Sequence, residues 1–149
     1  MKKVISIMFA ALIITASSLA LFGQGAAADK LASGNYVVYA RSPQVWRFVV
    51  DAKTMGNAAV AGHFAISEGT PKNIDVFVFD EDNFKKWSSD VDATHASAKP
   101  LFTLSKKDVG DLNVKIAQPG AYYLVFSDMF QYEGTKGLTA DVKLQYDKK

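Results

Sequence analysis

Cysteine is absent from the 149-residue sequence, and only two histidines are present. No disulfide can therefore brace the folded chain, no lipid can be attached through a thiol, and core packing must hold the protein together. The missing cysteine also removes one class of nucleophile, and His63 and His95 are far apart in sequence. No Gly-x-Ser-x-Gly elbow, phosphate-binding glycine loop or His-Glu-x-x-His motif occurs. We therefore expect a protein that is not an enzyme and that uses no cofactor.

Excess charge is absent too, once the first 28 residues are set aside. The whole chain carries 17 Lys and Arg against 15 Asp and Glu, and Lys2 and Lys3 account for the difference. A neutral remainder offers no basic surface along which a phosphate backbone could bind, so nucleic acid is not an expected partner. With 49% hydrophobic residues, the chain can build the core of one domain.

The first 28 residues have the three parts of a secretory signal peptide. Lys2 and Lys3 form a positive start, Val4 to Phe22 is apolar, and Ala26 to Ala28 offers small residues to a signal peptidase. The alternative is an uncleaved membrane anchor, because the apolar stretch is nearly long enough to span about 30 Å of hydrocarbon. Serines inside that stretch and small residues after it favour cleavage. We therefore expect residues 1–28 to be removed, and residues 29–149 to form one exported domain, periplasmic or extracellular, that does not span a membrane.

Alternating apolar residues predict short strands along most of the remainder, after a polar lead-in at Asp29 to Ser33. The last third is the clearest case, because Tyr122 to Phe126 is so apolar that both of its faces must be covered. Leu138 to Tyr146 then alternates strictly, which suits a strand with one buried face. This pattern predicts an all-β fold, an antiparallel two-sheet β-sandwich or jelly roll of about eight strands. The other expected strands are 35–41, 45–52, 58–67, 74–79, 100–105 and 111–117, with a turn at 106–110.

Two residues stand out inside the predicted strand 58–67. Gly62 lies in mid-strand, where a glycine marks a bulge or the close approach of another backbone. His63 shares its strand face with alanines, so that face could meet solvent or a second packed surface. A surface or core histidine is therefore favoured over a catalytic one.

One short helix is expected among the strands. Asp80 can cap it, and Phe84 and Trp87 stand three residues apart and would share one buried side. Asp80, Glu81 and Asp82 could instead offer carboxylate oxygens to calcium. Their spacing is not that of a calcium loop, and the start of a helix accounts for all three, so we expect no metal site. The following residues, 88–99, are expected to form a polar connection that contains His95.

Two aromatic residues fall outside the predicted strands and are the candidate binding residues. Phe130 and Tyr132 flank Gln131 in the connection that precedes Gly134, where a packed core does not require them. Loops held by a rigid scaffold are where binding residues concentrate, so this loop is where we expect an interaction surface to lie. The alternative is a hydrophobic plug, with Phe130 over the open end of the sandwich.

Three stretches, in order, resemble the GOLD (Golgi dynamics) β-sandwich domain over about residues 42–146. Ala59 to Phe64 is a strand of small residues with a glycine before an aromatic, and Asn73 to Asp80 is a central strand that runs into an acidic turn. Pro119 to Phe130, continued by Lys136 to Leu144, is similar to the closing hairpin of that family. An Asn-Phe-x-x-Trp element at residues 83–87 also looks like one in exported bacterial proteins of unknown function.

The family is known from the luminal part of cargo receptors of the early secretory pathway, and the chain departs from those members in several ways. Val125 stands where one cysteine of their disulfide is expected, Asp128 replaces an expected asparagine, and their coiled coil, membrane span and sorting tail are not found before Lys149. The resemblance implies a non-catalytic interaction module for protein or lipid. We expect its partner to be an envelope or extracellular protein.

Two other functions are weighed against this one. A carbohydrate-binding module is the alternative, because 12% of the residues are aromatic and the sandwich class is common to such modules. An enzyme comes third, since a fold never excludes one, and it would need a site assembled from scattered carboxylates.

Overall fold

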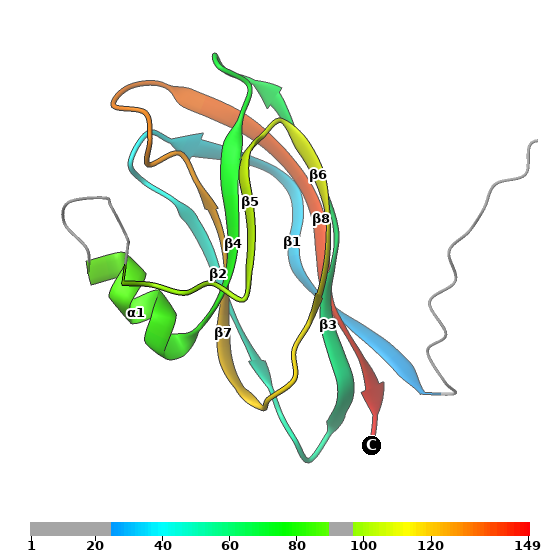
Figure 1. Cartoon of the computed structure of the whole chain (residues 1–149). Helices are drawn as coiled ribbons and strands as arrows, with labels where there is room; N and C mark the ends of the chain where they lie inside the picture. The colour runs from blue at the N-terminus through cyan, green and yellow to red at the C-terminus, as the bar shows by residue number, and fades with distance from the viewer. Residues whose placement is uncertain (1–24, 90–96) are drawn as a thin grey trace, which may run out of the picture.

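The computed structural model describes residues 25–89 and 97–149, and over these residues it confirms the all-β, antiparallel two-sheet sandwich. In this part of the chain, eight strands form two sheets of four, and one short helix lies outside them (Figure 1). Within the same residues, no helix combines the length and the apolar character needed to cross a bilayer. The elements are β1 (Ala26–Tyr39), β2 (Gln44–Val50), β3 (Met55–Glu68), β4 (Ile74–Asp80), α1 (Glu81–Ser89), β5 (Phe102–Lys107), β6 (Val109–Lys115), β7 (Gly120–Ser127) and β8 (Thr135–Lys148).

Each sheet contains strands from both halves of the chain. The β1 sheet has the order β1-β8-β3-β6, and the β2 sheet has the order β2-β7-β4-β5. Antiparallel pairs therefore join β1 to β8, β2 to β7, β3 to β6 and β4 to β5. A long hairpin that rolls up into two layers gives this order, which is that of a jelly roll.

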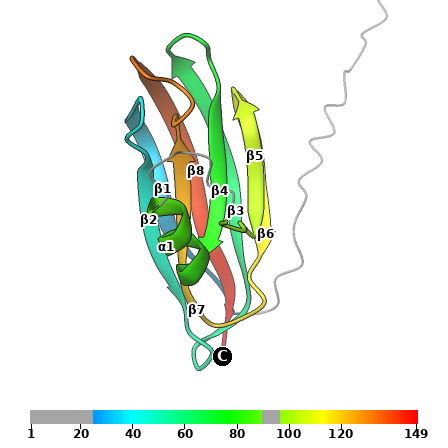
Figure 2. The ribbon, with the colours of Figure 1, turned by 60° about the vertical axis from the view of Figure 1, so that its left-hand side comes forward.

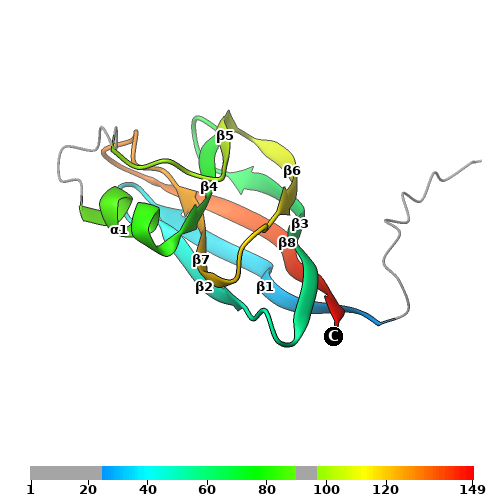
Figure 3. The same cartoon turned by 60° about the horizontal axis from the view of Figure 1, so that its bottom comes forward.

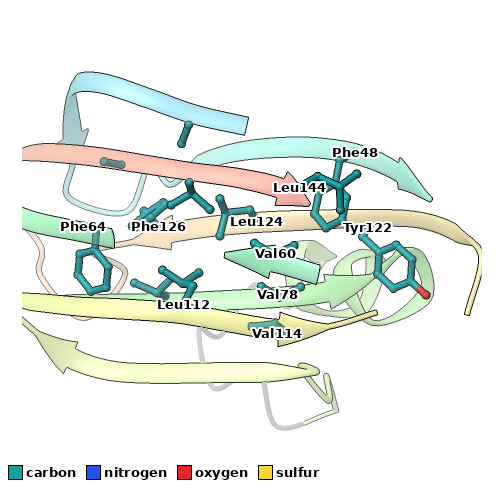
Figure 4. Close-up of a cluster of buried hydrophobic side chains, with 14 of the residues drawn as sticks. Phe48, Val60, Phe64, Val78, Leu112, Val114, Tyr122, Leu124, Phe126 and Leu144 are labelled. Atoms are coloured by element: carbon teal, nitrogen blue, oxygen red, sulfur yellow. The ribbon is translucent and has the colours of Figure 1, made fainter. Parts of the chain in front are cut away.

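The core lies between the two sheets, where inward-facing residues of both interdigitate (Figure 4). Phe64 of the β1 sheet meets Phe126 of the β2 sheet edge to face, with ring centroids 5.4 Å apart, and both rings are fully buried. On β8, the alternating residues that were expected to face inward are buried as predicted, from Leu138 to Leu144. Because each large apolar side chain removed from water contributes roughly 1.5–3 kcal/mol, this layer supplies the main stabilisation.

Helix α1 covers the outer face of the β2 sheet over β4 and β7 (Figure 2). The backbone N–H of Asn83 donates a hydrogen bond to Oδ1 of Asp80 at 2.8 Å, which confirms the predicted cap. Trp87 is only 5% exposed, and the Phe84 ring stacks on Tyr123 with centroids 3.9 Å apart. The apolar strand β7 is thus covered on both faces, as its sequence required. Helix α1 does not reach the outer face of the β1 sheet (Figure 3).

The predicted close approach at Gly62 is confirmed. A Cβ atom at this position would lie 2.1 Å from the carbonyl oxygen of Asp141 on the neighbouring strand β8, and φ at Gly62 is 153°. No other residue type fits without moving the backbone, which explains a glycine in the middle of a strand.

The first strand differs from its prediction. Asp29 to Ser33 was expected to be a polar lead-in, but β1 begins at Ala26 and pairs with β8 along most of its length. A register shift between Lys30 and Ala32 breaks the alternation that signals a strand in sequence. Pairing with a neighbouring strand therefore overrides a weak local pattern.

Two connections are also shorter than predicted. The expected turn at 106–110 shrinks to a single residue, Asp108, because β5 continues to Lys107 and β6 begins at Val109. Ser88 and Ser89, predicted to start a polar connection, are the last residues of α1. The rest of that predicted connection up to residue 96, with His95, lies outside the described residues.

Candidate contact surface

Four connections gather at one end of the sandwich, away from the C-terminus (Figure 1). They are the β1–β2 turn, the β3–β4 loop, the β5–β6 turn and the β7–β8 loop. The β7–β8 loop, residues 128–134, is tied to the β1–β2 turn by two backbone hydrogen bonds. The N–H of Ala40 donates to the carbonyl of Gly134 at 3.0 Å, and the N–H of Arg41 donates to the carbonyl of Asp128 at 3.3 Å. The two connections therefore form one joined surface.

A buried ion pair lies beneath this surface. Nζ of Lys136 is 3.2 Å from Oδ1 of Asp128, and the two side chains are 2% and 1% exposed. The same ammonium donates to the backbone carbonyl of Asn73 at 2.5 Å and to its side-chain oxygen at 3.1 Å. One cation thus joins β8, the β7–β8 loop and the β3–β4 loop.

The carboxyl group of Asp128 is held by charge more than by hydrogen bonds. Among the described residues, neither of its oxygens accepts a well-aligned hydrogen bond. Burial raises the pKa of Asp128, the Lys136 ammonium opposes that shift both as a nearby donor and by its charge, and the nearby Asp75 carboxylate adds to it. Lys136 is therefore the group that favours the ionised form of this buried carboxyl.

Phe130, the first candidate binding residue, covers this pair. Its half-buried ring lies 4.9 Å from Nζ of Lys136 and 5.5 Å from Nζ of Lys106, measured to the ring centroid. A ring face over an ammonium is attractive and keeps water away from it. The position of the ring favours the plug interpretation for Phe130.

Tyr132, the second candidate, points away from the core. It is 82% exposed, and the guanidinium carbon of Arg41 lies 5.0 Å from the centre of its ring. Tyr39, at the end of β1, is also exposed and lies opposite Thr135, just beyond the loop. We call these three residues, Tyr39, Arg41 and Tyr132, the contact surface. The structure thus brings Tyr132 together with Arg41 of the β1–β2 turn and leaves Phe130 beneath, while Tyr39 lies at the adjoining end of β1.

Sequence reasoning did not identify Arg41 or the buried ion pair. Arg41 stands 91 positions before Tyr132, and nothing local links them. The sequence did hold a sign that Lys136 is buried. Leu138, Ala140 and Val142 alternate along β8 and face inward, and residue 136 continues the same alternation towards the start of the strand. A lysine on a buried face needs an acidic partner, so this alternation could have prompted a search that included Asp128.

Three other residues considered in the sequence, His63, Asp80 and Glu81, have partners close by in the structure. Nδ1 of His63 is 2.8 Å from Oδ1 of Asp111, and both side chains are exposed on the outer face of the β1 sheet. Asp80 accepts the helix-capping bond, and Glu81 pairs with Lys85 at 3.5 Å. Over residues 25–89 and 97–149, no three His, Cys, Asp or Glu side chains gather closely enough to hold a metal ion.

Comparison with known proteins finds no family model that matches the chain and no curated protein sequence that matches it.

Proposed function

We propose that the chain is an exported, non-catalytic interaction module of the GOLD-like kind, which binds a protein, or less favourably a lipid, through the contact surface. The observation that carries this proposal is Tyr132, a large aromatic side chain left 82% exposed on a loop that is anchored at both ends. Tyrosine and arginine are the residue types that dominate binding energy at protein interfaces, and here they stack on each other.

The rigidity of the loop supports the proposal. Asp128 at its start is held by the buried ion pair, and Gly134 at its end is bonded to Ala40. A contact residue held in place before binding loses little conformational entropy when a partner arrives. An exposed tyrosine on such a loop is therefore better suited to recognition than to stability.

The experiment is a pull-down from envelope extract with the purified protein as bait, under mild crosslinking. We expect one protein to be recovered by the wild type and lost with Tyr132→Ala. The matched control is Lys115→Ala, an exposed substitution on β6 outside the contact surface, which should recover the same protein. Recovery that is equal for all three baits contradicts the proposal.

A carbohydrate-binding module is the second candidate, and the exposed rings of Tyr39 and Tyr132 are what favour it. Sugars stack on planar rings, so binding on a glycan array that is lost with Tyr132→Ala would support this function over the first. A blank array with well-folded protein removes it.

A further inference from the structure

Strand β2 offers a free edge beside the contact surface. It is the outermost strand of its sheet and pairs with β7 on one side only, within the part of the chain that the structure describes. An edge strand presents backbone N–H and C=O groups that another chain can pair with. Natural sheets usually protect such edges with charged residues, lysine above all.

The other three edge strands carry this protection. β1 contains Asp29 and Lys30 next to its register shift, and β6 contains Asp111 and Lys115. β5 ends in two consecutive lysines, the first with a positive φ of 51°. β2, with the sequence QVWRFVV, has Arg47 as its only charged residue. It is the least protected edge of the sandwich.

Apolar side chains line both sides of the β2 edge. Val45 and Val49 of β2 point outward and are exposed. On the inner side, Trp46 and Tyr36 of β1 are only partly buried and meet edge to face at 4.9 Å. A strand added beside β2 would cover both rows.

The charged side chains of β2 and of the residues just before it are all positive, and the first carboxylate, Asp51, follows the end of the strand. Residues 31–50 contain two charged side chains, Arg41 and Arg47, and these are the only arginines in the sequence. The remainder of residues 29–149 balances this charge, because the whole segment is neutral. A partner that carries carboxylates is therefore complementary to this segment, since arginine pairs with carboxylates through strong charge-assisted hydrogen bonds.

From these observations we infer that the β2 edge binds an extended, acidic segment of another protein, which adds to the β2 sheet as a fifth strand. Backbone hydrogen bonds to β2 would hold the segment, its alternate apolar side chains would cover Trp46 and Tyr36, and its carboxylates would meet Arg47. The inference rests on the proposed function. It names the class of partner that would meet the contact surface, which the β2 edge adjoins at Arg41.

Two other occupants fit less well. In a dimer of two β2 edges paired antiparallel along their full length, the central residue Arg47 lies opposite its own copy, and like charges in that position are destabilising. An anionic membrane surface is usually recognised by clusters of about four to eight Lys and Arg, whereas residues 31–50 contain two charged residues.

The test is a selection of random decapeptides displayed on phage against the immobilised protein. We expect the enriched peptides to alternate apolar and acidic residues and to bind at least tenfold more weakly to Arg47→Glu. Bound peptide should slow hydrogen exchange of β2 amides. Lys115→Glu makes the same charge reversal on the β6 edge and should change affinity by less than twofold. If Arg47→Glu does not fold, Arg47→Gln replaces it, with an expected loss of at least threefold.

Several results would overturn the inference. They are no enrichment, enriched peptides that lack acidic residues, binding indifferent to Arg47, and protection of amides on another strand. Arg47-dependent sedimentation with phosphatidylserine vesicles would favour the membrane instead, and an Arg47-dependent dimer in the ultracentrifuge would favour a second copy. A partner captured through Tyr132 while peptides ignore β2 overturns this inference alone and leaves the proposed function standing.

Discussion

The ammonium of Lys136 lies 3.2 Å from the carboxylate of Asp128, and both groups are buried directly beneath the proposed contact surface. Removing one partner leaves an uncompensated buried charge, which typically costs about 3–5 kcal/mol. We therefore expect Lys136→Met to lower the free energy of unfolding by about that amount at pH 7, measured by urea denaturation. Lys115→Met, which removes an exposed lysine from β6, should cost less than about 1 kcal/mol.

The cost of Lys136→Met should shrink as the pH falls. Burial already raises the pKa of Asp128 in the folded state, and Lys136 opposes that shift, so the pKa rises further without it. An acid whose folded pKa is raised destabilises the fold above that pKa, and the penalty disappears as the pH falls towards the unfolded value near 4. The difference in stability between variant and wild type is thus expected to be largest at pH 7 and smaller at pH 4. A difference that does not change with pH contradicts the assignment.

Trp87 anchors α1 to the β2 sheet. Its ring contacts Phe79 and Phe77 at 5.7 and 6.0 Å between centroids, so Trp87→Ala removes a large buried side chain. We expect a loss of about 3–5 kcal/mol in urea denaturation. Lys86→Ala, one residue earlier and exposed, is the control and should be nearly neutral. A loss below about 1 kcal/mol for Trp87→Ala would place this ring at the surface in solution.

Gly62 allows a comparison of steric clash with backbone strain. Gly62→Ala puts a methyl group against the β8 backbone, whereas Gly34, also at a positive φ of 136°, has no described atom within 4 Å of a new Cβ. Both substitutions carry the cost of an unfavourable φ, but only the first carries the clash. Gly62→Ala should therefore destabilise by at least about 2 kcal/mol more than Gly34→Ala, as measured by urea denaturation. Equal losses would argue against the close approach.

The two loop aromatics should separate in a thermal melt. Phe130→Ala uncovers the Lys136 ammonium and should lower the melting temperature by several degrees, because 1 kcal/mol corresponds to about 3–6 °C in a domain of this size. Tyr132→Ala removes an exposed ring and should leave the melting temperature within about 2 °C. A large drop for Tyr132→Ala, measured by circular dichroism, would assign it to the fold and remove it from the contact surface.

The sequence predicted the parts of the fold that are set by local pattern. Strand β8 alternates strictly, strand β7 is apolar throughout, and Asp80 stands where a helix cap belongs. It did not predict the first half of β1, since the irregularity after Lys30 hides the period of two and the pairing partner lies over 100 residues away.

The site was predicted only in part, for a related reason. Phe130 and Tyr132 were found as aromatics without a core position, but the direction of a side chain in a loop depends on contacts outside that loop. Phe130 turns inward because Lys136 is held below it by Asn73, 63 positions earlier in the chain. Tyr132 turns outward to Arg41. No local sequence pattern encodes the contact of Lys136 with Asn73 or the contact of Tyr132 with Arg41.

The most direct test of the proposed function places a photo-crosslinking amino acid at position 132 in living cells. Benzoylphenylalanine in place of Tyr132 keeps a large aromatic side chain in the same exposed position. We expect irradiation to yield one dominant adduct with another protein. The same amino acid at Asn113, exposed on β6 away from the contact surface, should yield none. If position 132 gives no adduct beyond that seen at position 113, the contact surface is not where this protein meets a partner.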